Sequence, residues 1–175
     1  MRKHNLAFID IETTGLDVWK HEIIEIGAVI TTPDLEVIEE FELKIKPEHI
    51  ENADPTSMKI NHYDPKDWVG ARTLKDAMVI FTDKVKDAIM VGQNVAFDSG
   101  FLEHAYAKTN ISNTMHYHKF DTISIAWAKL HREPDLEHFS LRELCLRFGI
   151  ENKSPHTGLG DARATYELYK KLMSL

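Results

Sequence analysis

A chain of 175 residues, of which 43% are hydrophobic and 28% charged, is long enough to bury a core and has the composition of an ordinary globular domain. The net charge of −7 excludes the generally basic surface that many nucleic-acid-binding proteins carry. Bound divalent cations would offset part of this charge, so the acidity remains compatible with a metal-dependent enzyme that acts on phosphate esters.

The composition also indicates where the protein works. The single cysteine, Cys145, lies in an apolar stretch and excludes an intrachain disulfide. No apolar run approaches the roughly 20 residues that span a bilayer, and the N-terminus lacks the apolar stretch of a signal peptide. We therefore expect one domain over 1–175, in a cytoplasmic protein with no membrane contact and a buried Cys145.

The first predicted elements are three strands. Residues 6–9 are wholly apolar and end at Asp10, as expected of a strand that is covered on both faces. Residues 22–31 and 35–45 are rich in β-branched side chains, and Thr32-Pro33-Asp34 between them predicts a hairpin turn. The proline-containing segment 47–70 predicts a loop with one short helix.

Helices and short strands alternate in the rest of the chain. Apolar spacing predicts helices over 73–88, 97–108, 123–130 and 161–172, and extended segments over 89–91 and 118–121. Ser140 and Glu143 form a capping-box pattern before a helix that ends at Gly149. Three strands followed by alternating helices and strands predict an α/β fold with a mixed sheet.

The first candidate site lies where the first strand ends, at Asp10-Ile11-Glu12-Thr13-Thr14-Gly15-Leu16. Side chains alternate along a strand, so Asp10 and Glu12 project from one face. Acids after a buried strand are costly unless a cation compensates them, although a solvated strand end explains them equally well. The hydroxyl residues before Gly15 add donors that a ligand could approach.

Two later segments place carboxylates at the ends of other elements. Asp98 follows the predicted strand 89–91 and opens a helix, where α/β folds place ligands, although an acid in the first turn of a helix is also favoured by the helix dipole. His156 precedes Asp161 by five residues, and Gly158 and Gly160 between them indicate a flexible segment. A mobile imidazole beside a fixed carboxylate is typical of a general base, whereas any lone histidine can also be a surface residue.

Carboxylates from separate elements can converge to bridge two ions about 3.5–4 Å apart. Oxygen ligation favours Mg²⁺ or Mn²⁺ over zinc. The residues therefore predict a two-metal hydrolase in which His156 accepts a proton from the attacking water.

These three motifs, in order and spacing, resemble those of the DEDDh (DnaQ-like) 3′–5′ exonucleases, and the resemblance covers Phe8 to about Tyr166. It implies a ribonuclease H-like fold with a mixed five-stranded sheet flanked by helices. It also implies that Asp10, Glu12, Asp98 and Asp161 hold two divalent ions, Mg²⁺ or Mn²⁺, and that His156 is the general base. The reaction implied is release of nucleoside monophosphates from the 3′ end of single-stranded DNA or RNA.

The same resemblance assigns residues around the metal site. It implies that Thr13, Thr14 and Leu16 contact the 3′-terminal nucleotide and that Phe101 shapes its pocket. Asp121 is interpreted as a helix cap. The segment DIETTGL is more similar to the DNA-polymerase-associated and RNase T-like members than to the oligoribonucleases, which adds a DNA polymerase as a candidate partner.

The chain departs from the family at Asn61-His62-Tyr63, where relatives often carry His-Gly-Ile, and in the two glycines of the third motif. The alternative function is a non-catalytic or polymerase-associated subunit that binds nucleic acid and retains the exonuclease fold. The aromatic residues Trp19, Tyr63, Trp68 and Phe101 could stack on bases, with core packing as the alternative role of each. The choice between DNA and RNA and the oligomeric state stay open at this stage.

Overall fold

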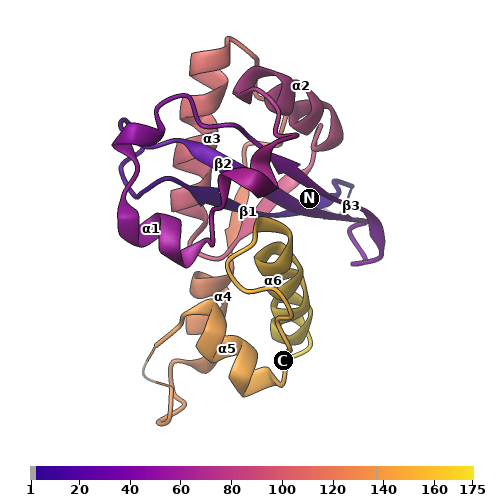
Figure 1. Cartoon of the computed structure of the whole chain (residues 1–175). Helices are drawn as coiled ribbons and strands as arrows, with labels where there is room; N and C mark the ends of the chain where they lie inside the picture. Colours follow the sequence, from indigo (N-terminus) through magenta and orange to yellow (C-terminus); the bar gives the residue numbers. More distant parts are fainter. Residues whose placement is uncertain (1–2, 137) are drawn as a thin grey trace.

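A computed structural model describes residues 3–136 and 138–175 and places a five-stranded sheet between two layers of helices (Figure 1). Met1 and Arg2, the first residues of the charged N-terminal stretch, lie outside the described residues, as does Glu137. The strands are β1 (Leu6–Thr13), β2 (Ile23–Thr31), β3 (Val37–Lys44), β4 (Ile89–Gly92) and β5 (Lys119–Asp121).

The strand order is β3-β2-β1-β4-β5. The pairs β1–β2 and β2–β3 are antiparallel, whereas β1–β4 and β4–β5 are parallel. The predicted mixed five-stranded sheet is thus confirmed, and so is the hairpin between β2 and β3, where the Leu35 amide donates to the Thr32 carbonyl.

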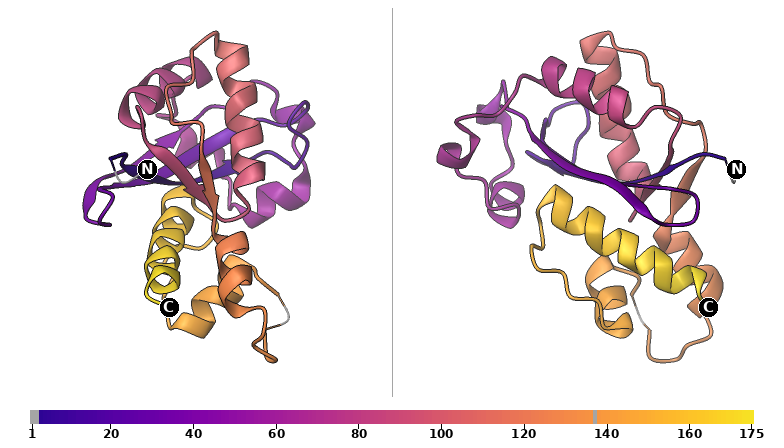
Figure 2. Two further views of the ribbon diagram at one scale, coloured as in Figure 1. Left: turned by 180° about the vertical axis from the view of Figure 1, so that it is seen from behind. Right: turned by 90° about the vertical axis from the view of Figure 1, so that its right-hand side faces the viewer.

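The helices are α1 (Pro55–Ile60), α2 (Leu74–Lys84), α3 (Val95–Thr109), α4 (Thr122–Leu130), α5 (Leu141–Phe148) and α6 (Gly158–Met173), with short 3₁₀ helices at Ile50–Asn52 and Pro65–Trp68. Helices α2 and α3 lie on one side of the sheet, and α4, α5 and α6 lie on the other (Figures 1 and 2).

Alternation along β1 divides its side chains between two cores. Ala7, Ile9 and Ile11 join the core beneath α2 and α3, whereas Leu6 and Phe8 join the core beneath α6. Because side chains on a strand alternate, Asp10 and Glu12 share the face of Leu6 and Phe8. The acidic residues therefore face the layer that contains α6.

Several helix ends differ from the sequence prediction. Helix α2 ends at Lys84, four residues before the predicted end, because Val85 leaves the helical conformation. Helix α6 begins at Gly158 rather than Asp161, so Gly158 and Gly160 belong to its first turn, and the prediction of a flexible glycine segment was wrong there. The cap assigned to Asp121 and the capping box at Ser140 are confirmed, since each side chain accepts from a backbone amide of the helix it precedes.

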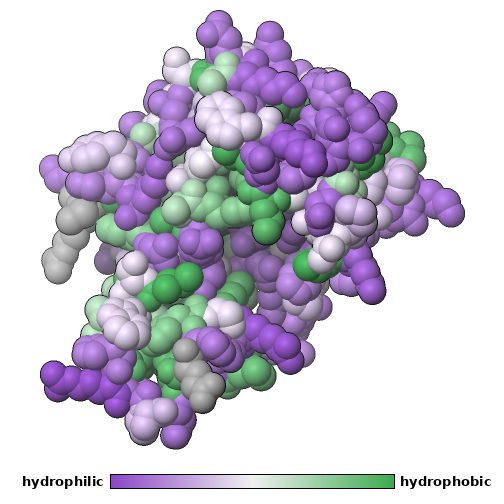
Figure 3. Space-filling model, turned by 90° about the vertical axis from the view of Figure 1, so that its left-hand side faces the viewer, coloured by the Kyte–Doolittle hydropathy of each residue, from purple (hydrophilic) through white to green (hydrophobic). Residues whose placement is uncertain are grey.

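The face shown in Figure 3 is mostly hydrophilic, with hydrophobic side chains visible near its centre and in its lower part, at the level of α4 and α5. Cys145 is buried, as predicted, and 5% exposed. Among the described residues, no helix combines the length and the apolar character needed to cross a bilayer.

Candidate active site

Three carboxylates from two elements meet on the α6 side of the sheet. Oxygen atoms of Asp10, Glu12 and Asp161 all lie within 4.8 Å of one another. Asp10 and Glu12 come from the C-terminal half of β1, and Asp161 comes from the first turn of α6, which crosses β1 and β2. Asp161, which is 149 positions from Glu12 and 151 from Asp10, thus joins them in one oxygen-rich cluster that could hold a cation.

Asp98 approaches this cluster from α3. It is 3% exposed, and its Oδ1 accepts a hydrogen bond of 3.1 Å from the Ile11 amide. Strand β4 pairs with β1 only from Leu6 to Phe8, so the next part of β1 has no neighbouring strand on that side and Asp98 supplies the acceptor. Asp98 lies outside the three-residue cluster, but its charge acts on both Asp10 and Glu12.

The pKa values of these acids are raised because their charged forms are buried close to one another. Burial, followed by the charges of Asp98 and Asp161, raises the pKa of Asp10 well above its ordinary value. Burial and the Asp161 charge raise the pKa of Glu12 to about 8, and burial raises that of Asp98 to about 7. Within the described residues, no Lys or Arg forms an ion pair with Asp10 or Glu12. The cluster therefore has the charge and the ligand atoms of a divalent cation site.

A close contact between two glycines positions α6. A Cβ atom on Gly27 of β2 would overlap the Gly158 backbone, and one on Gly158 would lie 2.7 Å from the Gly27 amide nitrogen. The Gly158 amide donates a 2.6 Å hydrogen bond to Oε1 of Glu25, which is 3% exposed. The glycines of the third motif thus bring the start of α6, and with it Asp161, onto the sheet.

Glu25 was not among the site residues predicted from the sequence. Its position as an acid within the apolar run Ile23–Thr31 was the available indication. Burial and the Glu42 charge raise its pKa to about 7, while the Gly158 hydrogen bond opposes the shift.

The segment before α6 donates hydrogen bonds to both carboxylate oxygens of Asp161. The Asn152 amide donates to Asp161 Oδ1 over 2.5 Å, and the His156 backbone amide donates to Oδ2 over 3.2 Å. His156 is exposed and has a φ of 62°, a left-handed conformation that is uncommon for residues other than glycine. Asn152 was also not predicted from the sequence, in which its nearness to His156 was the available indication.

A cavity of about 410 Å³ opens beside these residues and is lined by Asp161, His156, Asn152 and apolar residues of α5. It gives solvent access to the imidazole of His156 and to the Asp161 carboxylate. Asp161 is half-buried, and burial raises its pKa, while the Asn152 and His156 hydrogen bonds oppose the shift.

The residues after Glu12 form an ordered turn. Thr13 Oγ1 donates to the Gly15 carbonyl, and Thr14 Oγ1 accepts from the Glu22 amide. Both threonines are buried, whereas Leu16 is 78% exposed. The hydroxyl groups predicted to contact substrate thus hold the turn in this structure, and Leu16 presents its side chain to solvent.

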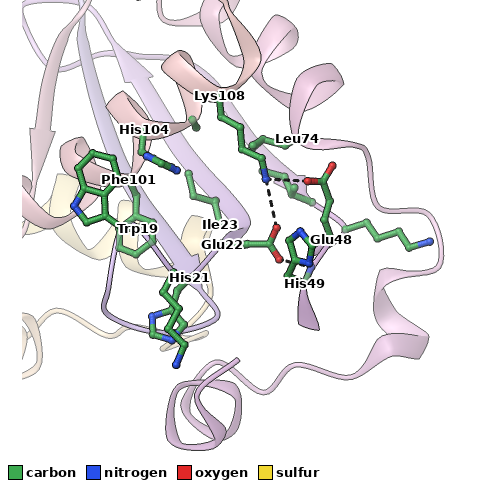
Figure 4. A pocket seen from close by; sticks show the side chains of 14 residues that line it. Trp19, His21, Glu22, Ile23, Glu48, His49, Leu74, Phe101, His104 and Lys108 are labelled. Carbon is green, nitrogen blue, oxygen red and sulfur yellow. Dashed lines mark hydrogen bonds and ion pairs between the residues drawn. The ribbon is translucent and has the colours of Figure 1, made fainter. Parts of the chain in front are cut away.

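Phe101 lies on α3 and is 3% exposed. It lines a cavity of about 110 Å³ together with Trp19, His104 and other residues, shown in Figure 4. Its ring packs against that of Phe97, with 5.0 Å between the centroids. Phe97 is half-buried and is therefore the more accessible ring of the pair.

The structure shows what residues 61–63, which differ from the family pattern, do in this chain. The Asn61 side-chain amide donates 2.9 Å to the Thr13 carbonyl, so it supports the turn beside the carboxylates. His62 has a φ of 53°, at the position where relatives often carry glycine. His62 thus adopts a left-handed conformation, which glycine takes more readily than other residues.

Comparisons with known proteins identify the family and the fold. Residues 7–169 match the RNase T family model, which describes an exonuclease. DNA polymerase III subunit epsilon of Aquifex aeolicus (strain VF5) is 30% identical over 94% of this chain and 78% of its own length. The PolC-type DNA polymerase III of Latilactobacillus sakei is 32% identical over 94% of this chain, which corresponds to 11% of that polymerase.

Solved structures show the same fold. A zinc-bound complex of Escherichia coli exonuclease I with single-stranded DNA has a TM-score of 0.87 and 19% identity, and it covers 98% of this chain and 41% of exonuclease I. The chain therefore corresponds to less than half of that enzyme, and to about a ninth of the PolC-type polymerase.

Proposed function

Because this chain belongs to the RNase T family of exonucleases, we propose that it hydrolyses the last phosphodiester bond at the 3′ end of single-stranded DNA or RNA and releases nucleoside monophosphates. The observation that carries this proposal is the convergence of Asp10, Glu12 and Asp161 within 4.8 Å. Residues 1–175 would form one exonuclease domain.

Four carboxylates would hold two divalent cations, Mg²⁺ or Mn²⁺: Asp10, Glu12, Asp98 and Asp161. The fit is supported by three half-buried carboxylates and the buried Asp98, whose pKa values are all raised by burial. Within the described residues, no Lys or Arg forms an ion pair with any of the four. When bound, such ions supply an activated water and stabilise the negative charge that develops on phosphate. Oxygen ligands favour Mg²⁺ or Mn²⁺, while the zinc-bound form of exonuclease I makes Zn²⁺ a necessary comparison.

His156 would act as the general base. The water oxygen attacks phosphorus, its proton passes to the imidazole, and the bond from phosphorus to the 3′ oxygen of the preceding nucleotide breaks. The exposed position of His156 and its backbone hydrogen bond to Asp161 support this role, because they fix the His156 backbone next to one carboxylate and leave the side chain open to solvent.

The 3′-terminal nucleotide would lie against the turn that follows β1. Leu16 would contact it with its exposed side chain, and Thr13 and Thr14 would present the backbone of their turn. Phe101 would form the base of the pocket beneath the more accessible Phe97 ring. The polymerase relatives support a DNA polymerase as a partner of this domain.

Digestion of 5′-labelled DNA and RNA strands of one sequence, single- and double-stranded, in Mg²⁺, Mn²⁺ and Zn²⁺ tests the proposal. We expect a ladder that shortens from the 3′ end, with mononucleotide products. Asp98→Ala should abolish it, and His156→Ala should lower the rate by about 10²–10⁴-fold. Intact strands from folded wild-type protein in every metal would contradict the activity and would favour a subunit that binds without cutting.

A further inference from the structure

Trp19 differs from the other three aromatic candidates in being open to solvent. Its exposed fraction is 83%, whereas Trp68 is 8% exposed and Phe101 is 3% exposed. The Trp68 indole donates to the Ile24 carbonyl over 3.0 Å, and Tyr63 packs on it with 4.8 Å between ring centroids. Core packing therefore accounts for those three rings but not for Trp19.

The backbone that carries Trp19 is fixed by its own hydrogen bonds. The Trp19 amide donates to Oδ1 of Asp17 over 2.9 Å, and the Asp17 carbonyl accepts from the Lys20 and His21 amides. The Asp17 amide donates to Nδ1 of His21 over 2.9 Å, which closes the turn. An apolar ring held in solvent by an ordered turn is preorganised to bind a flat ligand.

The ring is also oriented by a neighbour. His104 of α3 packs against the Trp19 indole edge to face, with 5.1 Å between the centroids and an interplanar angle of 84° (Figure 4). This contact restricts rotation of the indole but leaves most of its surface exposed.

Trp19 lies near two of the proposed substrate contacts, Leu16 and Phe101. It follows Leu16 by three residues, so the two backbones are at most about 10 Å apart. Trp19 lines the same cavity of about 110 Å³ as Phe101. Leu16 is 78% exposed, so the segment that follows Glu12 carries two exposed apolar side chains three residues apart.

The rim of the cavity carries positive charge. Lys20 and Lys46 line it, and neither has an ion-pair partner among the residues that the structure describes. Lys108 is instead paired with Glu48 at 2.8 Å and with Glu22 at 3.7 Å. Two ammonium groups and an exposed indole on one cavity match the two surfaces of a nucleotide strand, its phosphates and its bases.

We propose that Trp19 is a stacking platform for a nucleobase in the 3′-terminal segment of the substrate strand, oriented by His104. This inference rests on the proposed exonuclease function and adds a binding residue to it. Stacking needs an unpaired base with a free face and tolerates any base. Trp19 thus favours single-stranded or frayed 3′ ends without selecting their sequence.

Steady-state digestion of single-stranded oligonucleotides by the full chain in Mn²⁺ tests this role. Trp19→Ala should raise KM by about 5- to 100-fold with a smaller effect on kcat, and Trp19→Phe should recover most of the loss. Trp127→Phe is the matched control, because Trp127 is also exposed, at 57%, but lies on α4. It should leave KM unchanged.

Strands with one abasic residue at the first, second or third position from the 3′ end identify the stacked base. At one position, the missing base should weaken the wild type but cause no further loss in Trp19→Ala. Additive losses at all three positions, an unchanged KM in Trp19→Ala, or a full loss in Trp19→Phe would overturn the platform. Wild-type protein that degrades no strand would instead refute the exonuclease function, so the two failures are distinguishable.

Discussion

The Gly158 amide and the Glu25 carboxylate, 133 positions apart, share a buried hydrogen bond of 2.6 Å that joins the start of α6 to β2. Asp161 follows Gly158 by three residues, in the first turn of the same helix. The position of one cluster carboxylate thus depends on a second, buried carboxylate that is not part of the cluster.

Glu25→Ala should therefore affect both stability and activity. It leaves the Gly158 amide buried without an acceptor, which costs about 1–3 kcal/mol, and it releases the first turn of α6. We expect lower unfolding free energy in a denaturant titration and a rate in Mn²⁺ that falls by about tenfold or more. Glu25→Gln keeps an acceptor oxygen and should retain most of the activity. Equal activity in Glu25→Ala and the wild type would show that this hydrogen bond does not position Asp161.

The contact between Gly27 and Gly158 gives a second prediction. Gly27→Ala places a methyl group on the Gly158 backbone, so β2 and α6 must separate. We expect destabilisation of about 1–3 kcal/mol, typical of overpacking in a core, and loss of activity. Gly100→Ala is the matched control, because a Cβ atom there meets nothing within 4 Å and lies in helix α3. It should stabilise the protein by about 0.5–1 kcal/mol, as measured by the same unfolding titration.

The sequence predicted the sheet better than it predicted the start of α6. Strands β1, β2 and β4 are apolar over most of their length, and hydrophobic patterning decides such elements locally. Gly158 and Gly160 looked like breaks in a helix because glycine has low helix propensity. Their role is visible only when Gly27, a residue of another element, is placed against them.

In the candidate site, too, local patterns could be predicted from the sequence, whereas tertiary contacts could not. Asp10 and Glu12 were placed on one face by strand alternation alone, and Asp98 and Asp161 were proposed from their positions at element ends. Glu25 and Asn152 were missed because each acts through a partner that is distant in the chain or in a loop without a pattern. The exposure of Trp19 and the burial of Phe101 likewise depend on tertiary packing.

Asn152 should control the orientation of Asp161. Its amide group donates to Asp161 Oδ1 over 2.5 Å, so Asn152→Ala removes one of the two hydrogen bonds that orient the carboxylate and leaves the one from the His156 amide. We expect Mn²⁺ affinity, measured by titration calorimetry, to fall by about 10- to 100-fold, as for other residues that orient metal ligands. Asn152→Asp should be worse, because it replaces a donor with a second negative charge. Unchanged Mn²⁺ affinity in both variants would contradict the positioning role.

The raised pKa values predict how the metal-free protein responds to pH. Glu12 has a pKa of about 8, and Asp98 and Glu25 of about 7, all above the values of unfolded carboxylates near 4. Between pH 4 and 8 the folded state therefore binds more protons than the unfolded state, and stability must fall as pH rises through this window. In EDTA, we expect Tm to drop by on the order of 5 °C from pH 5.5 to pH 8.

A divalent cation should reverse this trend, because it binds the ionised carboxylates of the folded state. Mn²⁺ at about 100 times its Kd would add about 2.7 kcal/mol of stability, and the increase should be larger at pH 8 than at pH 5.5. The glutamine side chain in Glu12→Gln cannot ionise, so Tm in EDTA should depend less on pH in this variant. Its Tm should also rise less when Mn²⁺ is added. A wild-type Tm in EDTA that is higher at pH 8 than at pH 5.5 would show that these carboxylates are not held together in the folded protein.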